Sequence, residues 1–261
     1  MIDTSIKWLC AAILTSLIGL HSMNALAVPD EIQVYTDDMD EPGEFGLELH
    51  GNFVMSGPKE PGYEGEAPSH HVLQMTPEFS YGISKTLEAG LYFPPIAIAP
   101  DNKVQANGMR LRLKYIAPKE EGDTLFWGLN TEFGYSSRRV SESAWNAEIR
   151  PIIGYRDEKW LFAFNPILDL AFSDGMSKQP QFEPALKVSR NVGHGLNIGV
   201  EHYSALGSMQ NLNQTEMHGH SLYVAVDYEK GPLDINFGIG RGYGVDADQW
   251  VAKMIISVPL K

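Results

Sequence analysis

The segment Glu201-His202-Tyr203-Ser204 places a histidine and a serine two residues apart. In an extended strand this spacing puts both side chains on one face. A histidine within hydrogen-bond reach of a serine can activate it as a nucleophile, provided that a third group orients the histidine. Ala205 follows Ser204, and the sequence offers no obvious carboxylate on that face. We therefore predict no catalytic residues and no enzyme. A lipid-modifying hydrolase that uses His202 and Ser204 stays open as an alternative.

Two histidine pairs could bind a metal. His70 and His71 are adjacent, whereas His218 and His220 are two residues apart and could share a strand face. Two imidazoles leave a zinc site incomplete, and the sequence defines no third ligand. We predict no metal site and no cofactor.

Charged residues of both signs recur at alternate positions along several segments. Bases at one segment tend to face acids at the next, such as Arg112 and Glu132, or Lys187 and Glu201. They could close a barrel with salt bridges or line a narrow polar channel. The candidate pore-lining residues are Arg110, Arg112, Lys114, Glu132, Glu148, Arg150, Glu183, Lys187, Glu201 and Asp234.

These residues belong to segments with a period of two, which is typical of strands. Met109, Leu111 and Leu113, for example, alternate with Arg110 and Arg112. The predicted strands are 44–55, 70–82, 86–94, 104–117, 124–136, 143–156, 159–172, 181–191, 195–206, 215–229, 232–241 and 247–260. Short and longer connectors alternate between them, as in a transmembrane up-and-down β-barrel.

The second face of these segments is apolar and almost uncharged. Each segment is long enough for a transmembrane strand, which needs about 9–11 residues. Only a closed barrel lets strands satisfy every backbone group in hydrocarbon. Aromatic residues near the segment ends would form the interfacial girdle: Tyr115, Tyr135, Tyr155, Trp160, Phe172, Tyr228 and Trp250. We predict an all-β transmembrane antiparallel barrel of about twelve strands. A soluble β-sandwich with the same periodicity is the alternative.

Composition narrows the function further. The 261 residues carry 20 Lys and Arg against 33 Asp and Glu, a formal net charge of -13. This acidity argues against nucleic acid as a partner, because such binding requires clustered Lys and Arg. Beyond the first thirty residues no apolar run approaches the ~18 residues of a spanning helix.

The N-terminus has the features of an export signal. Lys7, the apolar stretch from Trp8 to Leu20 and Ala25-Leu26-Ala27 form the three parts of a secretory signal peptide over residues 1–27. The single cysteine, Cys10, lies within it. We expect residues 28–43 to be a solvated acidic lead-in, and residues 44–261 to form the barrel.

Two stretches carry a resemblance to a known family. They are Glu148-Ile149-Arg150-Pro151-Ile152-Ile153-Gly154-Tyr155 followed by Asn165 to Leu170, and Phe182 to Ser189 followed by Gly199 to Gly207. Together they resemble the outer-membrane β-barrel family named for the meta-pathway of phenol degradation. The resemblance implies a transporter of hydrophobic or aromatic compounds, with no catalytic residue to carry over. The chain ends Pro259-Leu260-Lys261, without the terminal aromatic of many such barrels.

We therefore predict a porin-like passive channel or transporter for small molecules in the outer membrane of a Gram-negative bacterium. Its expected partners are outer-membrane lipid, lipopolysaccharide, a small-molecule solute and the barrel assembly machinery. A closed structural barrel and the hydrolase are the alternatives.

Overall fold

The computed structural model describes residues 31–173, 179–212, 218–231, 233–244 and 247–260, so the predicted signal peptide lies outside it. Its strands are β1 (Phe45–Ser56), β2 (Leu73–Ser84), β3 (Leu87–Tyr92), β4 (Ile96–Ile98), β5 (Val104–Ala106), β6 (Gly108–Ile116), β7 (Leu125–Ser136), β8 (Trp145–Arg156), β9 (Trp160–Asn165), β10 (Leu168–Ala171), β11 (Gln181–Phe182), β12 (Ala185–Gly193), β13 (Leu196–Ala205), β14 (Gly219–Tyr228), β15 (Asp234–Gly244) and β16 (Trp250–Leu260). Within these ranges no helix is long and apolar enough to cross a membrane.

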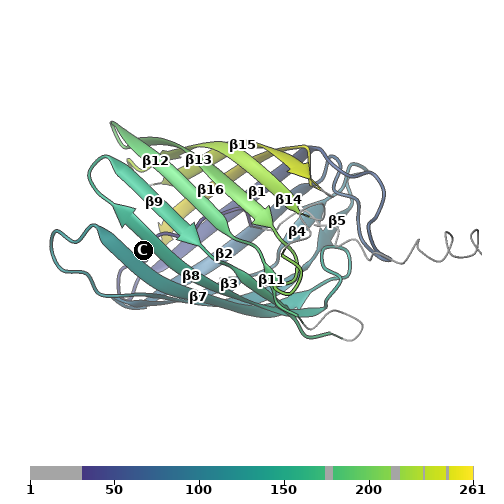
Figure 1. Ribbon diagram of the computed structural model, residues 1–261, viewed down its shortest axis with the longest axis horizontal. Helices are drawn as coiled ribbons and strands as arrows, with labels where there is room; N and C mark the ends of the chain where they lie inside the picture. The colour runs from purple at the N-terminus through teal and green to yellow at the C-terminus, as the bar shows by residue number, and fades with distance from the viewer. Residues whose placement is uncertain (1–30, 174–178, 213–217, 232, 245–246, 261) are drawn as a thin grey trace, which may run out of the picture.

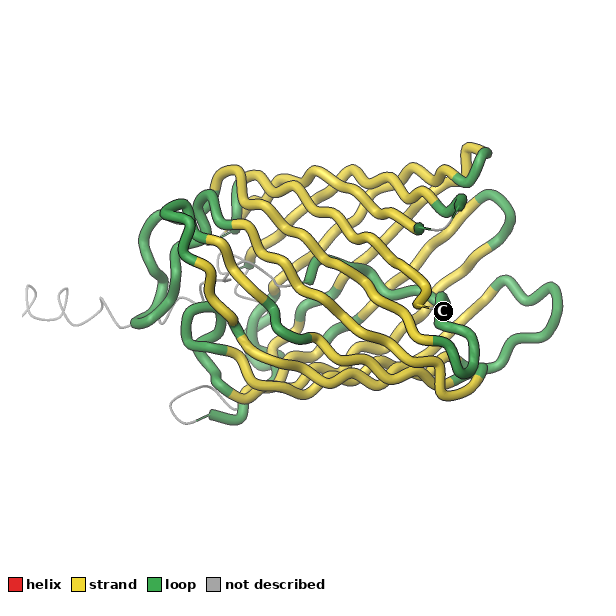
Figure 2. The backbone as a smooth tube through the Cα atoms, turned by 180° about the vertical axis from the view of Figure 1, so that it is seen from behind, coloured by secondary structure: helices red, strands yellow, loops and turns green. Residues whose placement is uncertain are grey.

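The strands form a closed antiparallel barrel (Figures 1 and 2), as the alternation predicts. β1 pairs with β2 on one side and with β16 on the other, which closes the sheet. Four of the twelve barrel strands are interrupted: β3 continues as β4, β5 as β6, β9 as β10, and β11 as β12. The pairing partners carry on past each interruption, since β8 pairs with both β9 and β10.

The connectors differ in length at the two ends of the barrel. The start of β1 and the end of β16 lie at one end, together with the short connectors at 85–86, 157–159 and 194–195. We call this the short-turn end. The connector at 57–72 and the other longer ones lie at the opposite end, called here the loop end. This is the predicted alternation. One predicted connector is shorter than expected, because β4 occupies part of the range from Pro95 to Lys103.

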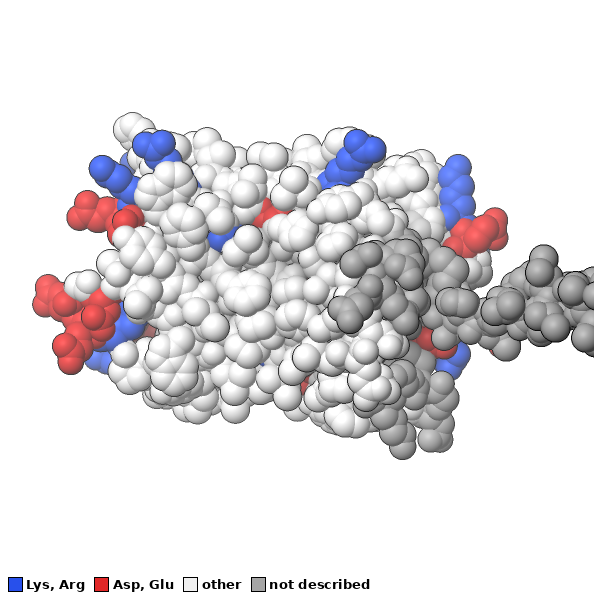
Figure 3. All heavy atoms as spheres, in the orientation of Figure 1, with Lys and Arg blue, Asp and Glu red and all other residues white. Residues whose placement is uncertain are grey.

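The outer wall is apolar. Leu111, Leu113 and Val224 are exposed by 57%, 45% and 62% respectively. Charged side chains on the visible face gather toward the two ends and leave a nearly uncharged band between them (Figure 3). Aromatic side chains near strand ends contact one another; for example, the Tyr135 and Trp145 rings lie 5.6 Å apart. This distribution suits a wall surrounded by hydrocarbon and flanked by interfaces.

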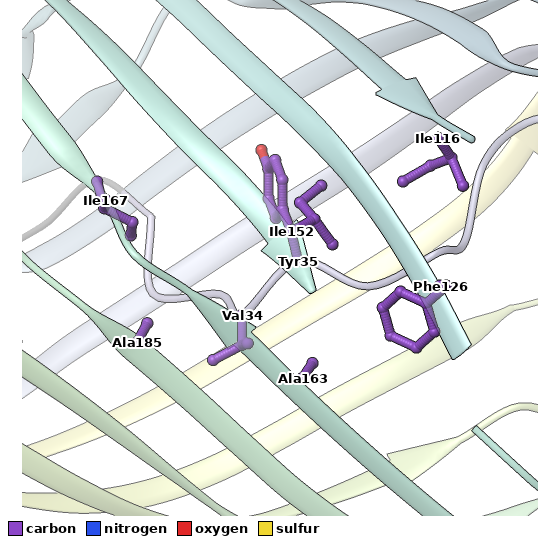
Figure 4. Packing of buried hydrophobic residues seen from close by; sticks show 8 residues of the cluster. All are labelled: Val34, Tyr35, Ile116, Phe126, Ile152, Ala163, Ile167 and Ala185. Atoms are coloured by element: carbon purple, nitrogen blue, oxygen red, sulfur yellow. The ribbon is translucent and has the colours of Figure 1, made fainter. Parts of the chain in front are cut away.

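The interior is filled with polar and charged side chains. It also contains the first part of residues 31–43, a stretch called here the lumen segment, whose last residues, 41–43, are exposed just before β1. Its residues Ile32, Val34 and Tyr35 are each at most 5% exposed. Val34 and Tyr35 belong to an apolar cluster with side chains of the barrel wall (Figure 4).

Candidate functional site: the lumen and the segment inside it

The lumen segment corrects the expectation of a solvated acidic lead-in. The acidic composition suggested solvation, yet its residues from Ile32 to Thr36 are almost all buried within the barrel. The barrel wall supplies the cations that compensate its acids. Arg150, for instance, lies 3.3 Å from the Glu31 carboxylate. Buried charges are tolerated where they are paired and hydrogen-bonded.

Wall side chains bind the backbone of the segment near the middle of the barrel. The Asn165 side chain accepts a hydrogen bond from the Tyr35 N–H at 2.7 Å and donates one to the Tyr35 carbonyl at 3.0 Å. Lys253 Nζ donates to the Ile32 carbonyl at 2.9 Å, and Arg150 donates to the Gln33 carbonyl at 3.3 Å. Asn165 therefore pairs with the segment as a neighbouring strand would, through both a donor and an acceptor.

The Tyr35 side chain lies among three cations of the wall. The distances from the ring centre to Arg150, Lys114 and Arg112 are 4.3, 5.2 and 5.7 Å. Each is within the range of a cation–π interaction. The hydroxyl groups of Tyr35 and Tyr92 lie 2.5 Å apart. The lumen thus encloses a phenol ring by both its face and its hydroxyl group.

Further along, the segment meets the short-turn end. Arg156 bonds Asp37 at 2.9 Å and Asp38 at 2.7 Å. The Gly43 N–H donates to the Gly82 carbonyl at 2.7 Å, next to β1. A Cβ at Gly82 would overlap the Glu41 carbonyl, so a glycine is required for the segment to pass this close.

The predicted lumen charges form two networks. In the first, Arg112 lies 2.5 Å from Glu78 and 2.8 Å from Glu88, and Arg110 lies 2.9 Å from Glu132. In the second, Glu201 pairs with the buried Lys253 and lies 3.4 Å from Lys187, which also bonds Asp227 at 2.8 Å.

The remaining candidates take different places. Glu148 bonds Arg150 at 2.6 Å, and Lys114 bonds the Asp38 carbonyl of the lumen segment. Glu183 is half-buried between β11 and β12. Asp234 is the first residue of β15 and is exposed at the short-turn end, away from both networks.

Sequence reasoning did not identify Tyr35 and Tyr92 as lumen residues. Tyr92 has the inward parity of Glu88 on β3, which was the available signal. Tyr35 carried no such signal, because it lies outside any alternating strand.

The described residues contain one three-residue set that could meet a cation. Ligand atoms of Glu48, His50 and Glu78 lie within 4.8 Å of one another. Glu78 already pairs with Arg112, and Gln33 donates a hydrogen bond to Glu48. We interpret the set as part of the charge network of the lumen.

The histidine and serine of β13 lie on the outer wall. Ser204 Oγ is 3.5 Å from His202 Nδ1 and 3.0 Å from His220 Nδ1 of β14. The Tyr243 hydroxyl is 3.0 Å from His202 Nε2. His220 was considered only as a metal ligand from the sequence, and its contact with Ser204 depends on the β13–β14 register. Among the described residues, these hydrogen bonds reach no carboxylate.

Comparison with known proteins supports the fold. No family model and no curated protein sequence matches the chain. Among solved structures it resembles an outer-membrane channel from Pseudomonas putida F1, with a TM-score of 0.57 and 11% identity over 88% of this chain and 100% of that one. The KdgM porin (TM-score 0.53, 8% identity) and the NanC porin (TM-score 0.52, 13% identity) are also similar, over 83% and 82% of this chain and 99% of each porin. The fold is that of Gram-negative outer-membrane barrels.

Proposed function

We propose that this protein is a passive outer-membrane channel for small molecules, whose passage is limited by the lumen segment. The main observation behind this proposal is that the lumen segment runs into a closed barrel. Wall side chains such as Asn165 and Lys253 hold the segment there by hydrogen bonds to its backbone. The barrel wall holds the lumen segment through only a few hydrogen bonds and ion pairs. Their release would clear space in a polar lumen while the barrel itself stayed closed.

The solute class that we propose is small and hydrophobic or aromatic. The resemblance to the phenol-pathway family implies this class, and the Tyr35 site supports it. There the lumen holds an aromatic ring against Arg150 and its hydroxyl group against Tyr92. A solute with a similar ring could take the same contacts once Tyr35 moves away.

Export and placement belong to the same proposal. Residues 1–27 direct the chain out of the cytoplasm, and the barrel assembly machinery inserts it into the outer membrane. Its apolar band then contacts lipid, and its loop end contacts lipopolysaccharide. The pore-lining role of the lumen charges, from Arg110 to Asp234, is also part of this proposal.

Liposome swelling tests the channel. Vesicles that contain the refolded protein should swell in small neutral solutes at a rate proportional to the solute gradient, and they should not swell in large oligosaccharides. A folded protein that passes no solute above the rate of empty vesicles would contradict the proposal.

A second candidate is the lipid-modifying hydrolase. It is favoured by one observation, the 3.0 Å approach of Ser204 Oγ to His220 Nδ1 on the outer wall. Release of fatty acid from lipopolysaccharide by the wild type, lost in Ser204→Ala, would support this function. Equal release by the two proteins would exclude Ser204 as the nucleophile.

A further inference from the structure

Polar side chains gather on the outer wall near the loop end of β13, β14 and β15, which are neighbours in the barrel (Figure 1). The register places Ser204, His220 and Tyr243 in one row across these strands. It places His202 and Arg241 in the next outward row, toward the middle of the wall. We call these five residues the polar patch.

Charge on the outer wall is rare and of one sign. The chain has 33 Asp and Glu against 20 Lys and Arg, yet the outward positions of the described strands hold no acid. The charged residues at those positions are Arg190 of β12 and Arg241 of β15. A charge on this face is costly unless its head group reaches the interface. These two arginines therefore mark the two interfaces of the barrel, Arg190 near the short-turn end and Arg241 near the loop end.

The aromatic neighbours of Arg241 set its depth in the membrane. Its guanidinium lies 5.7 Å from the ring centre of Trp250. Trp250 and Tyr243 are 44% and 51% exposed on the wall. Exposed Trp and Tyr near strand ends lie at the level of the lipid head groups. Since the longer loops of such barrels are extracellular, Arg241 meets the head groups of the outer leaflet.

The other members of the polar patch form a chain of hydrogen bonds. Ser204 Oγ lies 3.5 Å from His202 Nδ1 and 3.0 Å from His220 Nδ1, and His202 Nε2 lies 3.0 Å from the Tyr243 hydroxyl. With neutral imidazoles the chain can run in either direction. One direction leaves the His220 Nε2–H at the end of the chain, and the other leaves the Tyr243 O–H. The patch thus presents a hydrogen-bond donor beside Arg241 in both cases.

We propose that the polar patch binds a phosphate group of lipopolysaccharide at the outer surface of the barrel. The planar guanidinium of Arg241 matches a phosphate with two parallel hydrogen bonds, and the donor at the end of the chain adds another. Arg241 and Tyr243 lie about 7 Å apart along one strand face, a span that a phosphorylated sugar covers. The Ser204–His220 contact then orients a donor toward lipid instead of activating a nucleophile. This inference rests on the proposed placement in the outer membrane and names the residues that contact its lipid.

Native mass spectrometry of the refolded barrel, titrated with deep-rough lipopolysaccharide, tests the site. The variant is Arg241→Gln. The matched control is Arg190→Gln, because Arg190 also lies on the outer wall beside a tryptophan, 5.5 Å from the ring centre of Trp160, but near the short-turn end. We expect the dissociation constant to rise about tenfold in Arg241→Gln, as the loss of a charge-assisted hydrogen bond implies, and to stay unchanged in the control. Lipopolysaccharide treated with a phosphatase should bind the wild type as weakly as the intact lipid binds Arg241→Gln.

Equal affinity of Arg241→Gln and Arg190→Gln for lipopolysaccharide would overturn the site. An equal loss of phosphatidylglycerol binding in Arg241→Gln would also overturn it, because the patch would then recognise any anionic head group. If Arg241→Gln does not fold, Arg241→Lys keeps the charge without the planar fork and should weaken binding by a smaller factor. Conductance in planar bilayers that lack lipopolysaccharide should be the same for all variants. Its absence from the wild type would contradict the channel function and leave the lipid site standing.

Discussion

At the scale of single residues, Lys253 joins the barrel wall to the lumen segment. Lys253 and Glu201 are each 1% exposed and form an ion pair. Lys253 also donates to the Ile32 carbonyl. A buried pair adds little stability over apolar residues of the same size, but the loss of one partner leaves an uncompensated charge.

Lys253→Met should therefore destabilise the folded barrel by about 3 kcal/mol, at the lower end of the range for a broken buried pair because Lys187 still lies near Glu201. Denaturant unfolding in lipid vesicles, followed by tryptophan fluorescence, measures this loss. The double variant Lys253→Met/Glu201→Gln should recover part of it. If Lys253→Met is as stable as the wild type, the loss of Lys253 does not leave a destabilising charge on Glu201, and the prediction is wrong.

Asp248 gives the loop end a dependence on pH. Burial raises the pKa of this carboxyl group from 3.8 to about 6; the charge of Glu66 adds to the rise, and the hydrogen bond from Ser69 opposes it. The folded state thus binds this proton more tightly than the unfolded state. Its contribution to stability is fully present below about pH 4 and is lost as the pH rises through 6.

Asp248→Asn removes this loss while keeping an acceptor for Ser69. We expect the variant to unfold at a higher temperature than the wild type at pH 7.5, and the difference to vanish near pH 4. Thermal melts at the two pH values measure this. A constant difference between the two proteins at both values would assign the effect to something other than the ionisation of Asp248.

At the scale of elements, the outer face of each strand is fitted to lipid. Leu113 lies within β6 and is 45% exposed on that face. Leu113→Arg should cost about 2–4 kcal/mol and block assembly, as charge does near the midplane of a membrane. Leu125→Arg, at the first position of β7, should assemble nearly normally, because the cost falls to about 0–1 kcal/mol near the interface. The folded fraction of each variant is measured by its heat-modifiable mobility on a gel. Normal assembly of Leu113→Arg would contradict the facing of β6.

The strands were predictable because two solvents act on them. Lipid on one side and a polar lumen on the other impose a period of two, which is local in sequence; Met109 to Tyr115 shows it clearly. The interruptions at Pro166 and Pro184 were harder to foresee. Proline marks a break in a strand. That Pro166 lies opposite Pro184, however, depends on the pairing of β9 and β10 with β11 and β12.

At the scale of the whole molecule, the barrel and the lumen segment form one charge-compensated unit. The acids of residues 31–43 meet Arg150, Lys119 and Arg156, which lie more than seventy residues away in sequence. Composition alone indicated a solvated run, since the compensating charges come from elsewhere in the fold. The candidate lumen charges and the pairing of Lys187 with Glu201 were found by parity, whereas the contacts of Arg150 and Lys114 with the lumen segment were not.

The central claim is that the lumen segment limits passage, and single-channel conductance of Asn165→Ala tests it most directly. This variant removes both hydrogen bonds from Asn165 to Tyr35. The control is Asn236→Ala, a lumen asparagine that bonds Glu201 and Asp227 instead of the segment. We predict larger or more frequent openings for Asn165→Ala than for the wild type and the control. Identical traces from all three folded proteins, or silence from all three, would contradict the account.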